Sequence, residues 1–88
     1  MQTITTSKGK TYEVDYAWAP LFDGSCRIAI HDSRLISEIA PEFEELTSIH
    51  YSNPGTSEID WIGYNKLIAV SMQGDSLVEI VLMRGDSA

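Results

Sequence analysis

The sequence predicts a single, mainly β domain of the α+β class, built on a twisted antiparallel sheet or small barrel. Apolar and polar residues alternate along most of the chain, and turn-forming residues separate the alternating stretches at short intervals. Only one stretch changes to a helical period. With 88 residues, 43% of them apolar, the chain has room for one core, so we expect one domain over residues 1–88. About six to seven strands and one short helical segment would close most sheet edges.

The first half of the chain predicts three strands. Residues 3–6 are rich in threonine and isoleucine, and residues 12–18 alternate strictly between apolar and polar side chains. This alternation places Tyr12 and Trp18 on the same inward face, so we expect Trp18 to be buried. Residues 26–31 alternate in the same way. The turn signals between these strands are Ser7-Lys8-Gly9, Pro20 and Asp23-Gly24.

Residues 32–46 follow a helical period instead. Asp32 or Ser33 is the predicted N-cap, because a short side-chain oxygen can accept a hydrogen bond from the first free backbone N–H groups. Pro41 cannot donate to the carbonyl four residues earlier, which predicts either a kink or two short helices, the second beginning near Pro41. The predicted apolar stripe consists of Leu35, Ile39, Phe43 and Leu46.

The second half predicts further strands and a C-terminal hairpin. Gly63 marks a bulge or bend between two of the strands, and we expect Trp61 and Tyr64 to lie in the core and at the barrel rim. In the last strand Glu79 would face outward, next to a partly apolar outer surface at Val81 and Met83. The predicted strands are residues 49–51, 58–64, 65–72 and 77–83.

Charge excludes several classes of function. Thirteen acidic residues against six basic ones give a formal net charge of −7. Direct binding to nucleic acid or to an anionic membrane requires clustered Lys and Arg, and no apolar run reaches the length of a membrane span. The single cysteine favours a reducing compartment, so we expect a cytoplasmic domain. Its negative charge predicts that its partner is a protein, and a basic one. Simple solubility is the alternative explanation of the charge.

Catalytic and metal-binding patterns are weak. Cys26 is the single cysteine, on an inward strand position, where a buried structural thiol is expected rather than a nucleophile. His31 and His50 could approach one another only if their strands pair, and they lack the spacing of a zinc site. We predict no catalytic residues, no metal site, no cofactor and no enzymatic activity.

Two features predict partner binding. The first is a group of acids in and around the helical segment, interrupted only by Arg34, which could form a negative patch that imitates a phosphate backbone. A solvated surface is the simpler interpretation of any one of them. The second is Phe22, in an apolar loop that would anchor a protein partner if it is exposed. The predicted acidic binding residues are Asp23, Asp32, Glu38, Glu42, Glu44 and Glu45.

Four stretches of the chain resemble small uncharacterised proteins of bacterial prophages and mobile elements. These are Ile4–Val14 (ITTSKGKTYEV), His31–Arg34 (HDSR), Ile39–Phe43 (IAPEF) and Gly63–Leu67 (GYNKL). The resemblance carries over no functional residues. It implies a phage context, with the cytoplasm of a bacterial host as the location. Within that context it implies two classes of function: an acidic inhibitor of a host defence protein, such as an anti-CRISPR protein, or a virion or assembly component. Clustered acids favour inhibition, whereas an apolar, self-complementary surface, and with it a homo-oligomer, would favour assembly.

Overall fold

The computed structural model describes residues 1–19, 21 and 23–85. Its strands are β1 (Gln2–Thr6), β2 (Thr11–Trp18), β3 (Ser25–His31), β4 (Ser48–Asn53), β5 (Ser57–Ile62), β6 (Tyr64–Met72) and β7 (Leu77–Arg84). They form one seven-stranded sheet in the order β5-β4-β1-β2-β3-β7-β6. All neighbouring strands are antiparallel. The prediction of a mainly β fold with one short helical segment is confirmed.

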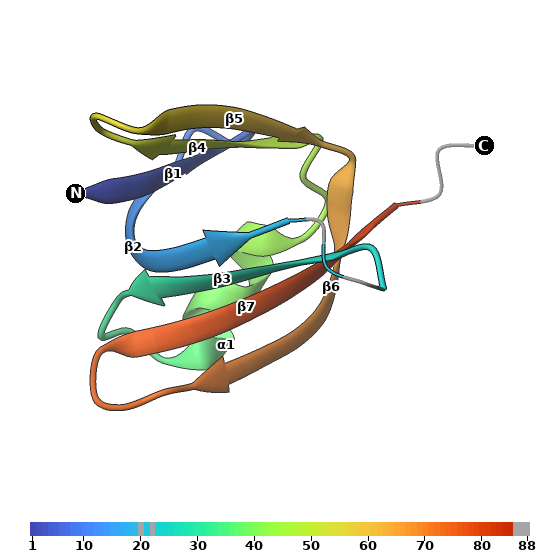
Figure 1. Ribbon diagram of the computed structural model, residues 1–88. Helices are drawn as coiled ribbons and strands as arrows, with labels where there is room; N and C mark the ends of the chain where they lie inside the picture. Colours follow the sequence, from blue (N-terminus) through green and yellow to red (C-terminus); the bar gives the residue numbers. More distant parts are fainter. Residues whose placement is uncertain (20, 22, 86–88) are drawn as a thin grey trace.

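The sheet is strongly bent, because its two edge strands follow one another in the chain. β5 ends at Ile62 and β6 begins at Tyr64, yet these strands lie at opposite ends of the strand order. Gly63 makes the bend with φ of +85°, a backbone conformation that costs glycine little. Its N–H donates to the Thr47 carbonyl, and its own carbonyl accepts from the Gly85 N–H. β6 therefore runs from one side of the curved sheet to the other (Figure 1).

The helical segment consists of two short pieces, α1 (Ile36–Ile39) and the 3-10 helix η1 (Ala40–Phe43). Pro41 lies in the first turn of η1, so of the two predicted alternatives, a kink or two short helices, the structure has the second. The predicted N-cap was wrong: Leu35 occupies that position in an extended conformation, with no side-chain cap. Leu35 is also 67% exposed, so the buried stripe begins only at Ile39.

The core lies between the curved sheet and the helical segment, which Figure 1 shows behind β3 and β7. Cys26 is fully buried as predicted, and burial raises the pKa of its thiol to about 12. Trp61 and Tyr64 are buried, again as predicted. The fully buried large side chains are Ile4, Ile28, Ile30, Ile39, Phe43, Leu46, Ile49, Val78, Ile80 and Leu82.

A β-bulge in β2 reverses the predicted burial of Trp18. Val14 pairs with Ile30 and Tyr16 with Ala29, so Asp15 has no partner on β3. The additional residue changes which alternate side chains point inward. Ala17 packs against the core, and Trp18 is 59% exposed. The prediction that Trp18 is buried was therefore wrong.

Candidate functional site

One arginine binds two of the acids that the sequence places together. Arg34 donates to both carboxylate oxygens of Asp32, with its Nη2 2.7 Å from Oδ2, and to both oxygens of Glu42 at 2.9 Å. Glu42 also accepts a hydrogen bond from the Tyr12 hydroxyl of β2. The side chains of Asp32 and Glu42 are only 15% and 19% exposed. Hydrogen bonds from Arg34 are the largest cause that lowers the pKa of each carboxyl.

The other predicted acids do not form one patch with this pair. Asp23 precedes β3 and Asp32 follows it, so the length of the strand, roughly 20 Å, separates them. Asp23 accepts hydrogen bonds from the hydroxyl and, after it, the backbone N–H of Ser25, and both lower the pKa of Asp23. The exposed acids that remain are Glu38, in the helical segment, and Glu44 and Glu45, which follow directly after it. Phe22 lies outside the described residues.

A second group of acids lies across the outward side of β5, β4, β1 and β2. Directly paired residues on neighbouring strands place their side chains on the same side of a sheet. The pairings give two rows, which we call the sheet face. The first row is Glu58, Ser52, Thr3 and Glu13, and the second is Asp60, His50, Thr5 and Thr11.

The sheet face is acidic and contains no basic residue that is permanently charged. Glu13, Glu58 and Asp60 are exposed, and the eight residues of the two rows include neither Lys nor Arg. Glu13 and Glu58 lie at opposite ends of their row, three strand spacings or roughly 14 Å apart. Ser52 and Thr3 lie between them, and in the second row the hydroxyls of Thr5 and Thr11 are 3.1 Å apart.

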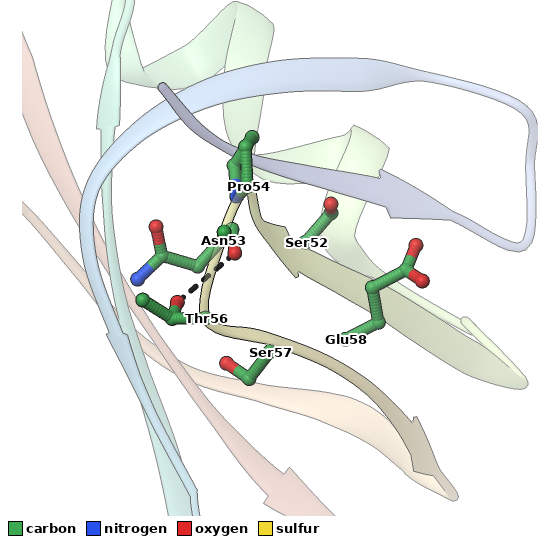
Figure 2. Close-up of a pocket in the computed structure, with 7 residues that line it drawn as sticks. Ser52, Asn53, Pro54, Thr56, Ser57 and Glu58 are labelled. Carbon is green, nitrogen blue, oxygen red and sulfur yellow. Dashed lines mark hydrogen bonds between the residues drawn. The ribbon is translucent and has the colours of Figure 1, made fainter.

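His50 links the two acids of β5. Its Nδ1 lies 2.6 Å from Asp60 Oδ1, and its Nε2 lies 3.4 Å from Glu58 Oε1. The hydrogen bond with Asp60, and after it the one with Glu58, raises the pKa of His50. The sheet face continues into the β4–β5 turn, where Figure 2 shows Ser52 beside Glu58 at a shallow, polar hollow of about 480 Å³. The Thr56 hydroxyl closes this turn by donating to the Asn53 carbonyl.

The outward side of β2, β3, β7 and β6 has a different character, which we call the aromatic face. Trp18 and Tyr16 lie side by side there, with ring centroids 5.7 Å apart. Tyr16 donates a hydrogen bond to Glu79, and Arg27 lies 3.8 Å from the same carboxylate. A shallow hollow of about 610 Å³ opens nearby; its lining residues are Leu21, Asp23, Ser25, Arg27, Ile68, Ala69 and Val81.

The histidines do not form a pair. β1 and β2 lie between the strand of His50 and the strand of His31. The Nε2 atom of His31 is instead 3.8 Å from Asp15 Oδ1. Among residues 1–19, 21 and 23–85, no three His, Cys, Asp or Glu side chains are grouped so that they could hold a metal ion. No helix in this part of the chain is long and apolar enough to cross a membrane.

Sequence reasoning missed the sheet face as a unit. The alternation marks Glu13 and Asp60 as outward residues of their own strands. Their common surface depends on β1 lying between β2 and β4, which alternation within a strand does not determine. No family model, curated protein sequence or solved structure matches this chain, so the sheet face and the aromatic face are the observations from which a function can be argued.

Proposed function

We propose that this chain is a non-enzymatic protein-binding domain that places its sheet face on a basic surface of a nucleic-acid-binding protein and blocks that surface. One observation carries the proposal: the three exposed carboxylates of the sheet face have no Lys or Arg among them. A groove that normally binds phosphates offers Lys and Arg side chains to such a face. The resemblance to prophage proteins supports a host defence protein, of the CRISPR type among others, as the target.

The acids of the helical segment contribute less to this proposal. Asp32 and Glu42 already hold Arg34, and Lys8 lies beside the same segment, with its Nζ 3.2 Å from the Pro41 carbonyl. A partner would have to compete with Arg34 for those two carboxylates. The carboxylates of the sheet face meet only His50 among the described residues, so they remain available to an incoming cation.

Two matched triple variants test the proposal. The sheet-face variant is E13Q/E58Q/D60N, and the control in the helical segment is E38Q/E44Q/E45Q. Each variant changes the formal net charge from −7 to −4 through exposed side chains. A difference in binding affinity between the two variants therefore reflects the position of the charges and not the total charge. The immobilised proteins are incubated with bacterial extract at pH 8 and two salt concentrations, and any captured protein is then purified for affinity measurements.

We expect the wild type and the control to capture a basic nucleic-acid-binding protein that a DNA oligonucleotide displaces. The sheet-face variant should bind it roughly tenfold more weakly, because three exposed charge pairs are lost. Raising the salt concentration should release it. Equal weakening in both variants would reduce the effect to net charge, and weakening in the control alone would assign binding to Glu38, Glu44 and Glu45. Capture of no such protein would refute the proposal.

A structural role in a larger assembly is the second candidate, because the aromatic face exposes Trp18 beside an apolar hollow. Exposed apolar surface of this kind is typical of protein contacts. Light scattering over a range of concentrations should then show association of the wild type and a monomer for Trp18→Ala. A wild-type protein that stays monomeric at high concentration would contradict self-assembly.

A further inference from the structure

His50 lies where both of its ring nitrogens meet a carboxylate. Nδ1 is 2.6 Å from Asp60 and Nε2 is 3.4 Å from Glu58. A neutral imidazole carries one N–H, so its other nitrogen would direct a lone pair at a negative oxygen. The imidazolium ion has two N–H groups and can donate to both carboxylates. The geometry therefore favours the protonated ring, in agreement with the raised pKa of His50.

The neighbouring strands do not oppose this effect. On β1, the residue paired with His50 is Thr5, which does not titrate near neutral pH. The next strand, β2, places Thr11 in the same row and Glu13 in the other, and an acid would only favour the charged ring. Lys8 follows β1, and its Nζ binds the Pro41 carbonyl in the helical segment. Among the described residues, His50 forms ion pairs with Glu58 and Asp60 only.

We propose that His50 sets the charge of the sheet face and thereby makes binding of a basic partner depend on pH near neutrality. This inference rests on the proposed function. The protonated ring cancels one of three negative charges, leaving −2, and its deprotonation restores −3. Binding therefore strengthens as the pH rises through the titration of His50. By linkage, a basic partner lowers the pKa of His50 and releases its proton.

The first part of the test concerns the free protein. An NMR titration follows the His50 ring in the wild type and in the variant Asp60→Asn, which removes the negative charge 2.6 Å from Nδ1. We expect His50 of the wild type to titrate at a higher pH than His50 of the variant, because the Asp60 carboxylate favours the protonated ring. Equal titration of His50 in the two proteins would overturn the inference.

The second part measures binding of a decalysine peptide at pH 5.5 and pH 8.0 in low salt. The wild type should bind about two- to fivefold more tightly at pH 8.0, the effect expected for one exposed charge, and His50→Gln should bind equally at both. Equal wild-type affinities would overturn the inference and leave the proposed function in place. Absence of binding at both pH values would overturn the proposed function, and the inference with it.

Discussion

The helical segment and the sheet face both carry several acids, but only the first has a permanently charged side chain, Arg34, bound among them. Arg34 lies between Asp32 and Glu42, with Tyr12 donating to Glu42 as well. The sheet face has no equivalent of Arg34, and its only internal cation is the titratable His50. Asp32 and Glu42 are thus tied to the fold by Arg34, whereas Glu13, Glu58 and Asp60, which strand pairing brings together, lie on an open surface.

This difference shows what a run of acidic residues in a sequence can and cannot indicate. Asp32 and Glu42 are paired with Arg34 and largely buried, so removal of Arg34 would leave two carboxylates without their partner, which costs free energy of folding. Glu13 and Glu58 are exposed, and among the described residues the ion-pair partner of Glu58 is the titratable His50. The two regions should therefore respond differently to substitution: stability should change in the first, and binding in the second.

The largest expected effect concerns the anchor of the helical segment. Phe43 is fully buried, with its ring centroid 5.0 Å from that of Tyr12. Phe43→Ala should lower the free energy of unfolding by about 3–5 kcal/mol, because it removes apolar contacts and leaves a cavity. Urea denaturation followed by circular dichroism measures this loss.

Leu35→Ala is the matched control, since Leu35 belongs to the same predicted stripe but is exposed. It should change the free energy of unfolding by less than about 0.5 kcal/mol. Similar losses in the two variants would mean that the helical segment is not held by Phe43, and the contrast between an anchored region and an open one would fail.

A smaller loss is expected when the cation is removed from between the two carboxylates. Arg34→Met should lower the free energy of unfolding by about 1–2 kcal/mol, a value reduced because the arginine side chain is itself partly exposed. Lys66→Met is the control, because Lys66 is exposed and forms no ion pair with the described residues. Urea denaturation at pH 7 should show little change for this control.

The pH dependence sharpens this second prediction. The pKa values of Asp32 and Glu42 are lowered, so the stability they contribute is complete above their unfolded values of about 4 and is lost as the pH falls through the folded ones. The wild type and Arg34→Met should therefore become more alike in acid. A difference that stays constant down to pH 2 would show that the arginine acts through packing of its carbon chain and not through the two carboxylates.

Local patterns predicted the elements well and their combination less well. Alternation identified the strands, and Pro41 identified the division of the helical segment. The start of the helix was misplaced because the apolar spacing includes Leu35, whose backbone is extended. The sheet face requires the strand order, which comes from contacts between distant parts of the chain. The sequence shows Arg34 only as a basic residue among the acids. The folded structure is needed to show that its guanidinium binds two of them.

The bulge at Asp15 also affects how the aromatic face could change in evolution. One residue without a partner on β3 separates a half-strand that sends Tyr12 and Val14 inward from one that sends Tyr16 and Trp18 outward. Loss of a single codon there would exchange the inner and outer sides of the second half-strand while the first kept its register. The aromatic face therefore depends on an insertion of one amino acid, and the acidic rows beside it could persist without that insertion.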